Sequence, residues 1–288
     1  MFSFLKKRKS TPPFMQRPSY TILKDEKLNN QLITNGYIVL PLLSAEEVLL
    51  LDKLYKKWHP TEPEFFYKSY FSDNMVYKKE VEDLIKQLFA PKLDEYFVNY
   101  ETLGGMYVVK PNGEKGKLPP HQDWTLVDEK IHWSLNCWCP LIDAVGENGN
   151  IQMLPKSHFF METVRGSGVP EYYCNLLDDV TPFLVDVPIK AGDAVFFYHS
   201  IIHCSTINTK QEARVTVNLS LVEKNAPIYY YFQKEQEQQI DRYTVNTEFY
   251  MNYASNREQA PQDMKATGKS EITFYKLSRK EFLNKVNG

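Results

Sequence analysis

Three metal-binding residues and one arginine stand at spacings that suit catalysis by a transition metal. His121 and Asp123 form a His-x-Asp pair, His203 follows 80 residues after Asp123, and Arg214 stands 11 residues beyond His203. Two imidazoles and one carboxylate on one face of an Fe(II) ion leave coordination positions open for a cosubstrate and O₂. A planar guanidinium binds a carboxylate through two parallel hydrogen bonds. These four residues therefore predict an iron site beside a clamp for a carboxylate.

The chain around the His-x-Asp pair favours the geometry that such a site needs. Residues 117–120 read Lys-Leu-Pro-Pro, and residues that precede proline avoid the helical region, so the backbone is expected to be extended. In an extended chain, side chains two positions apart lie on one face. His121 and Asp123 are therefore expected to point to the same side.

The other half of the site is predicted at the end of an apolar strand. Residues 194–199 are strongly apolar, and we expect this strand to continue to His203, with His199 four positions earlier on it. A hairpin through residues 206–210 would then return the chain to Arg214, so that the arginine and His203 point into one barrel. His199 is the competing metal ligand, or else a core histidine with one hydrogen-bonded ring nitrogen.

Helices are expected before this region. Ser44 followed three residues later by Glu47 predicts a capping box that starts a helix over residues 45–58. The apolar spacing predicts two further helical stretches, at residues 79–89 and 93–97.

From about residue 105 to residue 222 the pattern changes to short strands separated by Gly, Pro and Asn turns. The alternation of apolar and polar residues is clearest near the end of this region, as in a half-buried strand. The strand candidates cover residues 106–109, 131–139, 150–154, 183–187, 194–199 and 214–222. Many short strands favour a double-sheet jelly roll or another sandwich.

Four sequence blocks resemble the phytanoyl-CoA dioxygenase family of Fe(II)- and 2-oxoglutarate-dependent oxygenases, in the family's order. They are Met106–Pro111 leading to His121-Gln122-Asp123, Asn148-Gly149 to Ser157-His158, the Gly192-Asp193 strand ending in His203, and Arg214 with its strand. Residues 35–41 resemble the family's N-terminal part, so the resemblance spans about residues 30–222. It implies a mainly β fold with flanking helices, the cupin-like double-stranded β-helix or jelly roll.

The resemblance also implies which residues bind the cofactors. The His-x-Asp pair and His203 would hold Fe(II), because His203 and not His199 has the family's spacing to Arg214. The cosubstrate 2-oxoglutarate would chelate the iron, with its distal carboxylate at Arg214 and Ser205. The other cosubstrate-binding residues that the resemblance implies are Trp138, Met106 and Lys68.

Two positions bear on local structure and on the reaction. The family's usual Pro-Gly-Ser-His turn reads Pro155-Lys156-Ser157-His158, and the lost glycine predicts a changed loop backbone, since glycine adopts positive φ at lower cost. His158 is expected to be structural. Asp123 retains the carboxylate ligand that halogenation would require to be replaced, so hydroxylation or a related C–H oxidation is expected.

Composition agrees with one enzyme domain. The chain has 288 residues, of which 43% are apolar and 14% aromatic, enough for a sizeable core. We expect a basic flexible tail over residues 1–20 and one dioxygenase domain over residues 21–288. Within that domain we expect a helical part at 21–100, a jelly-roll core at about 105–222 and a C-terminal lid or packing segment at 223–288.

Charge and cysteine usage narrow the partners and the compartment. A net charge of −2 gives no overall attraction to nucleic acid, and no stretch is long and apolar enough to span a membrane. Cys137, Cys139, Cys174 and Cys204 form no Cys-x-x-Cys pair. We expect four reduced thiols and a cytoplasmic protein.

The predicted function is an Fe(II)- and 2-oxoglutarate-dependent dioxygenase. It would use O₂ to hydroxylate a C–H bond of a small-molecule or acyl-, CoA- or carrier-linked substrate, with release of succinate and CO₂. One alternative is a non-catalytic metal-binding jelly roll that acts as a sensor or scaffold, although such a protein has no need of Arg214. The other is a zinc hydrolase with a His₂-carboxylate site, for which no general base is identifiable.

Overall fold

The computed structural model describes residues 20–159, 164–169, 176–234, 239–253, 259–271 and 278–287. The predicted tail at residues 1–20 lies outside these ranges except for its last residue, and Cys174 lies outside them too. The other three cysteines, Cys137, Cys139 and Cys204, are buried free thiols. None of the helices in these ranges has the length and apolar character that crossing a bilayer requires.

The first third of the chain contains three long helices: α1 (Glu26–Asn35), α2 (Ala45–Trp58) and α3 (Met75–Tyr96). The predicted capping box of α2 is confirmed, because the Ser44 hydroxyl accepts from the Glu47 amide and the Glu47 carboxylate accepts from the Ser44 amide. Helix α1 ends at Gly36, whose φ of 86° is left-handed and suits glycine.

The prediction of two helices at 79–89 and 93–97 is wrong, because α3 is a single helix with Pro91 inside it. Proline removes one helical hydrogen bond and usually ends or kinks a helix. An apolar stripe nevertheless continues across it at every fourth position, and all its members are buried: Val81, Ile85, Phe89 and Leu93. Burial of this stripe therefore outweighs the local cost of the proline.

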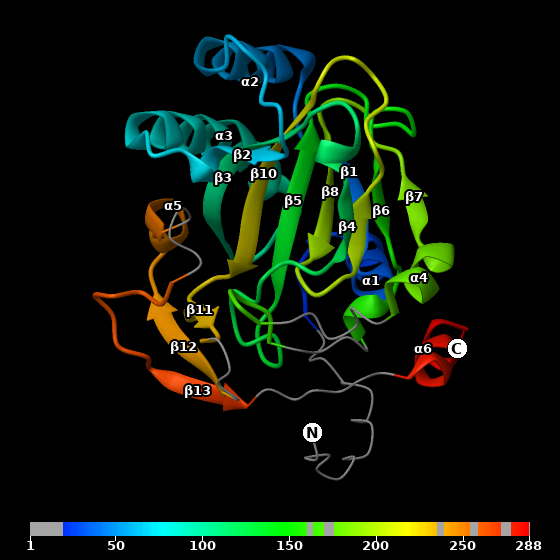
Figure 1. The fold of residues 1–288 in the computed structure, drawn as a ribbon, viewed down its shortest axis with the longest axis vertical. Helices are drawn as coiled ribbons and strands as arrows, with labels where there is room; N and C mark the ends of the chain where they lie inside the picture. Colours follow the sequence, from blue (N-terminus) through cyan, green and yellow to red (C-terminus); the bar gives the residue numbers. More distant parts are fainter. Residues whose placement is uncertain are drawn as a thin grey trace, which may run out of the picture.

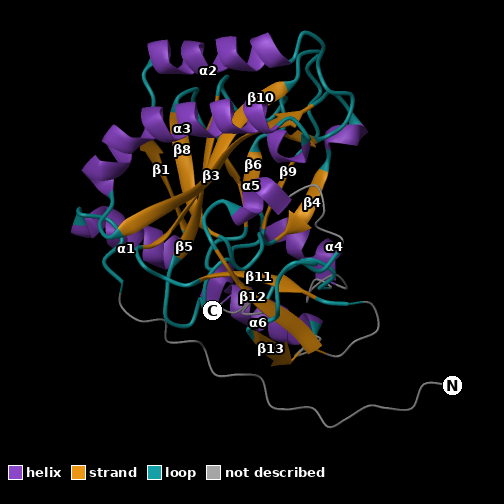
Figure 2. Cartoon of the chain, turned by 90° about the vertical axis from the view of Figure 1, so that its left-hand side faces the viewer, coloured by secondary structure: helices purple, strands orange, loops and turns teal. Residues whose placement is uncertain are grey.

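Two antiparallel sheets form the centre of the molecule (Figure 1). The larger has the order β1 (Tyr37–Pro41), β8 (Asp193–Tyr198), β5 (Ser134–Pro140), β10 (Arg214–Glu223), β3 (Tyr100–Lys110) and β2 (Tyr67–Lys68). The smaller has the order β4 (Leu118–His121), β9 (His203–Ser205), β6 (Ile151–Met153) and β7 (Val185–Val187). Helices α2 and α3 lie together on one side of the larger sheet (Figure 2). This is the predicted mainly β fold with flanking helices.

The larger sheet has two chemically different faces, which β10 illustrates. One set of its side chains joins the apolar cluster that the sheet forms with α1, α2 and α3; on β10 these are Val215, Val217, Leu219 and Leu221. Side chains alternate along a strand, so the opposite face carries Arg214, Thr216, Asn218 and Ser220. The period-two pattern thus turns an apolar face to the helices and a polar face to the space between the sheets.

Two predictions about the second half of the site are wrong. The apolar strand ends at Tyr198 as β8, and the Ile201 amide donates to the Tyr198 carbonyl in the turn that follows. His203 instead starts β9 in the other sheet, so His199 and His203 do not share a strand. Because β9 lies between β4 and β6 whereas β10 lies between β5 and β3, the chain crosses between sheets and makes no hairpin.

The C-terminal part adds a third sheet and two helices. They are β11 (Ile228–Phe232), β12 (Gln239–Val245), β13 (Gly268–Glu271), α5 (Phe249–Tyr253) and α6 (Arg279–Asn287). Tyr230 and Phe249 form an apolar cluster with Leu103 of β3 and with Leu126, so this sheet packs on the jelly roll. Helix α6 buries Phe282 against Val180 of the short helix α4 (Leu177–Val180).

Candidate metal centre and cosubstrate pocket

The three predicted metal ligands meet at one end of the smaller sheet. His121 ends β4 and pairs directly with His203, the first residue of β9, and Asp123 follows two residues after His121. Their ligand atoms all lie within 4.8 Å of one another. His121 Nε2 is 4.0 Å from Asp123 Oδ1, and His203 Nε2 is 3.8 Å from Asp123 Oδ2. Two imidazole nitrogens and a carboxylate at these distances can share one metal ion.

Hydrogen bonds orient each ligand. The Nδ1–H of His121 donates to the Pro119 carbonyl at 2.9 Å, and the Nδ1–H of His203 donates to the Ile201 carbonyl at 3.1 Å. A backbone carbonyl fixes the tautomer, so the Nε2 lone pair of each ring faces the site. Asn136 of β5 donates to Asp123 Oδ2 at 2.8 Å, which makes it an orienting residue that carries no sequence motif.

The electrostatics favour the metal-binding protonation states. Burial, with a smaller contribution from His203, lowers the pKa of His121 to about 3. Burial alone would raise the pKa of Asp123, but the neighbouring imidazoles of His203, His199 and His121 bring it below its ordinary value. A neutral imidazole and an ionised carboxylate at neutral pH are the forms that coordinate a metal.

Buried donors on β9 and β10 have no hydrogen-bond partner within the described ranges. Arg214 is 1% exposed, and its guanidinium carbon lies 4.9 Å from the Trp138 ring centroid. Among the described residues, its Nε and Nη1 have no hydrogen-bond partner. The buried hydroxyl of Ser205 also lacks one. Unsatisfied buried donors are costly, and burial lowers the pKa of Arg214 to about 9. A carboxylate bound here would satisfy these donors and supply the missing negative charge.

A cavity of about 530 Å³ opens beside the triad, and His121 and Asp123 form part of its wall. Of the residues that the resemblance implies, Lys68 and Met106 line this cavity, whereas Ser205, Trp138 and Arg214 are buried and are not among its lining residues. The C-terminal part contributes to the same wall through Tyr230, Phe249, Tyr250 and Tyr253.

His199 lies beside the triad without joining it. Its carbonyl accepts from the Asp123 amide at 3.0 Å, its Nε2 is 3.2 Å from the Ser220 hydroxyl, and its ring lines the cavity. Burial lowers its pKa to about 4, which keeps the ring neutral. His158, expected to be structural, stacks on Tyr198 at 4.9 Å and bonds the Ile33 carbonyl at 2.9 Å.

A buried ion pair anchors the segment after the His-x-Asp pair, and no sequence motif indicates it. The Arg165 Nε donates to the Asp123 carbonyl at 2.6 Å, and its guanidinium binds the Glu129 carboxylate at 2.6 and 3.0 Å. Arg165 and Glu129 are each 8% exposed. The two residues lie 36 positions apart, so only the folded chain reveals that they position Asp123.

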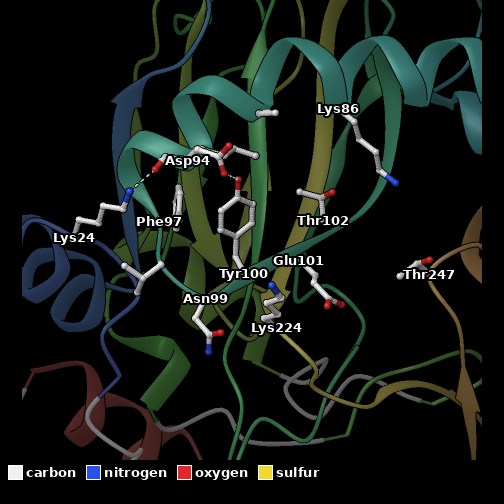
Figure 3. A pocket seen from close by; sticks show the side chains of 13 residues that line it. Lys24, Lys86, Asp94, Phe97, Asn99, Tyr100, Glu101, Thr102, Lys224 and Thr247 are labelled. Carbon is white, nitrogen blue, oxygen red and sulfur yellow. Dashed lines mark hydrogen bonds between the residues drawn. The ribbon is translucent and has the colours of Figure 1, made fainter.

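A second, open groove lies at the other end of β3 (Figure 3). Its lysines are largely occupied: Lys24 donates to the Asp94 carbonyl at 2.5 Å, and Lys86 pairs with Glu82. The carboxylate of Asp94 accepts from Tyr100 at 2.6 Å. Among the described residues, the lining of this groove includes no cluster of metal-binding side chains comparable with the triad.

Comparison with known proteins finds a matching family and related proteins. The family model described as phytanoyl-CoA dioxygenase matches residues 35–216. A Danio rerio phytanoyl-CoA dioxygenase domain-containing protein 1 is 26% identical over 187 residues, which cover 62% of this chain and 60% of that relative's length.

Solved structures share the fold. HygX from Streptomyces hygroscopicus, solved with nickel and 2-oxoglutarate, superposes with a TM-score of 0.51 at 17% identity, over 70% of this chain and 87% of HygX. The epimerase SnoN, solved with Fe³⁺, alpha ketoglutarate and nogalamycin RO, gives a TM-score of 0.51 at 21% identity, over 70% and 85% of the two chains. These likenesses confirm the predicted jelly roll. Because the family model matches more than half of this chain, the chain belongs to the phytanoyl-CoA dioxygenase family.

Proposed function

We propose that this protein hydroxylates a C–H bond of a small-molecule substrate, using Fe(II), 2-oxoglutarate and O₂ and releasing succinate and CO₂. The coarser statement, an iron- and 2-oxoglutarate-dependent oxygenase, follows from family membership. One observation carries the finer proposal: the same fold holds a compact His-Asp-His cluster and buried donors of Arg214 and Ser205 that have no partner in the part of the chain that the structure describes.

In this proposal His121, Asp123 and His203 hold the iron. Arg214 and Ser205 bind the distal carboxylate of 2-oxoglutarate, because their orphaned N–H and O–H groups match a carboxylate's acceptors. Three further residues are proposed to contact the cosubstrate. Trp138 lies with its ring against the Arg214 guanidinium, and Met106 and Lys68 belong to the cavity wall.

Bound Fe(II) with 2-oxoglutarate supplies the oxidising power, through decarboxylation of the cosubstrate by O₂. The protein's own groups orient the reactants and exclude water. Asp123, held by Asn136 at 2.8 Å, keeps a carboxylate where a halide would otherwise bind, which supports oxygen transfer over halogenation. SnoN is named an epimerase, so product analysis has to distinguish hydroxylation from other C–H oxidations.

The cavity wall supports a substrate with an apolar body. Its aromatic residues are Phe66, Tyr70, Phe71, Trp124, Tyr230, Phe249, Tyr250 and Tyr253. Three tyrosine hydroxyls are occupied by backbone groups: Tyr70 accepts from the Gly105 amide at 3.0 Å, Tyr253 donates to the Gln259 carbonyl at 2.6 Å, and Tyr250 donates to the Tyr229 carbonyl. These residues therefore offer ring surface rather than free hydroxyls.

A volume of about 530 Å³ is within the range of small-molecule sites. It suits a compact apolar molecule, or the acyl group alone of a CoA- or carrier-linked substrate. The C-terminal segment, proposed as residues 223–288, would act as a lid or packing wall over this cavity. The free thiols of the described chain support the proposed cytoplasmic setting.

The test is anaerobic visible absorption as Fe(II) and then 2-oxoglutarate are added to the purified protein, with His203→Ala and Arg214→Ala alongside. A weak charge-transfer band that needs both additions and disappears in His203→Ala supports the proposal. Succinate release is then screened with apolar ring compounds and with acyl-CoA thioesters. Metal binding without the band would favour the sensor, and metal-dependent hydrolysis without 2-oxoglutarate would favour the zinc hydrolase.

A further inference from the structure

Lys110, the last residue of β3, is fully buried although no carboxylate within the described ranges pairs with it. Its exposure is 0%, and its ammonium donates to three backbone carbonyls: Thr206 at 2.7 Å, Ser205 at 3.4 Å and Gly116. An ammonium has three donors, so its hydrogen bonds are complete. Every partner is uncharged, however, and a buried charge without a counter-charge is costly.

A second buried cation faces it. Lys110 stands directly opposite Arg214 in the β3–β10 ladder, so both side chains lie on the inner face of the sheet. Within the described ranges, the structure pairs neither cation with a carboxylate. Burial and then the charge of Arg214 lower the pKa of Lys110 to about 7. Two neighbouring cations in a buried site create a demand for negative charge.

The fold makes room for this lysine. A Cβ at Gly149 would lie 2.6 Å from the Lys110 Cδ and 2.6 Å from the Thr206 carbonyl oxygen, and a Cβ at Gly116 would lie 3.0 Å from the Lys110 Cγ. Gly149 also has a φ of 77°. The Asn148-Gly149 motif, which the metal site itself does not use, thus leaves space for the lysine stem.

We propose that Lys110 is a second cation of the cosubstrate site, which positions the strand carrying Ser205 and adds positive charge for the distal carboxylate of 2-oxoglutarate. This inference rests on the proposed function. Arg214 makes the direct hydrogen bonds, while Lys110 ties the carbonyls of Ser205 and Thr206 to the end of β3. Lys110 therefore acts on cosubstrate affinity and on the preference for a dicarboxylate, rather than on the C–H bond.

The test compares 2-oxoglutarate with 2-oxopentanoate, which has the same keto acid end and no distal carboxylate. Dissociation constants are measured by anaerobic calorimetry on the full-length protein loaded with Ni(II). The variants are Lys110→Gln, which removes the charge but keeps donors for the carbonyls, Lys110→Met, which removes both, and Lys110→Arg, which keeps the charge. Lys117→Met is the matched control, because Lys117 is exposed on the neighbouring segment. Melting temperatures monitor folding.

We expect Lys110→Gln to weaken the binding of 2-oxoglutarate at least about tenfold and the binding of 2-oxopentanoate less than about twofold. Lys117→Met should leave both dissociation constants unchanged. Lys110→Arg is expected to keep most of the preference for 2-oxoglutarate. The proposal is overturned if Lys110→Gln binds both keto acids equally more weakly, or if it binds neither more weakly. If Lys110→Gln fails to fold, the proposal is overturned when Lys110→Arg loses the preference for 2-oxoglutarate over 2-oxopentanoate. A wild-type protein that binds no 2-oxoglutarate would instead overturn the proposed function.

Discussion

The two faces of the six-stranded sheet use the same strands for opposite purposes. On β10, the apolar side chains of Leu219 and its neighbours pack under the helices. Arg214 on the opposite face buries donors that have no partner among the residues that the structure describes. The outer face, which packs on the helices, needs no ligand to satisfy its side chains. The inner face, which carries Arg214, has donors and positive charge that only a bound anion with hydrogen-bond acceptors would satisfy.

This difference indicates where the fold obtains stability and where it gives stability up. Apolar burial stabilises the folded state by roughly 25 cal/mol per Å². The outer face buries apolar side chains of β1, β3, β5, β8 and β10. Unpartnered buried donors cost about 1–3 kcal/mol each, so the inner face lowers the stability of the unliganded protein. Substitutions on the two faces should therefore separate stability from ligand binding.

The largest effect is expected for Arg214→Met. Loss of the partner of a buried carboxylate costs about 3–5 kcal/mol, so 2-oxoglutarate affinity should fall roughly 10²–10⁴-fold in calorimetry. The same change removes an uncompensated buried charge, so the unliganded variant should gain at least about 1 kcal/mol in urea unfolding. A variant that loses stability and keeps its affinity would contradict the division between the faces.

The converse is expected for Leu219→Ala on the outer face of the same strand. The side chain is 1% exposed, and such truncations cost about 2–5 kcal/mol of unfolding free energy. The 2-oxoglutarate dissociation constant should stay within about twofold of wild type, since the lost contacts lie on the helix side. A large change in affinity at a temperature where the variant is folded would show that the faces are coupled.

A third pair of substitutions uses adjacent residues of β5. Asn136 donates to Asp123 Oδ2 at 2.8 Å, and Asn136→Ala should weaken metal binding about 10–100-fold in a competitive chelator titration. Cys137, the next residue, faces the helices, so Cys137→Ala should lower stability and leave metal affinity unchanged. Equal metal affinities in the two variants would show that Asn136 does not contribute to metal binding through Asp123.

The inner face should also make cosubstrate binding depend on pH. Burial lowers the pKa of Lys110 to about 7 in the free protein, and a bound dianion would raise it again. Between pH 7 and 8.5 binding then takes up a proton, so 2-oxoglutarate affinity should fall with rising pH by up to about tenfold per unit. Calorimetry at several pH values should show this slope in wild type and a flatter one in Lys110→Gln.

Local sequence patterns were sufficient where the determinants are local. The alternation along β10 and the capping box of α2 come from neighbouring residues, and the close approach of His121 and Asp123 follows from their spacing on an extended chain. The helix through Pro91 was missed because tertiary burial of α3 outweighs a local breaker.

Long-range organisation was less accessible. The sequence does not mark where the chain leaves the larger sheet. Its apolar pattern therefore predicts a single strand, where the structure has β8 ending in one sheet and β9 beginning in the other. Two of the three carbonyl partners of Lys110 lie 95 and 96 residues away, and Arg165 reaches Asp123 across 42 residues. Such contacts carry no periodicity and no motif, so they become visible only when the sheets are assembled.

The smallest effect is expected at a turn outside both faces. Lys156 replaces the family's usual glycine and has a φ of 64°, while its amide donates to the Asn35 carbonyl at 3.0 Å. A left-handed conformation costs an L-residue about 1–2 kcal/mol, and the extra backbone freedom of glycine offsets about 0.5–1 kcal/mol of the relief. Lys156→Gly should therefore raise the unfolding free energy by up to about 1 kcal/mol, while Lys156→Ala, which keeps the strain, should change little. Equal stabilities in urea unfolding would mean that the turn relaxes around the side chain, and a changed 2-oxoglutarate affinity would mean that this turn is coupled to the inner face.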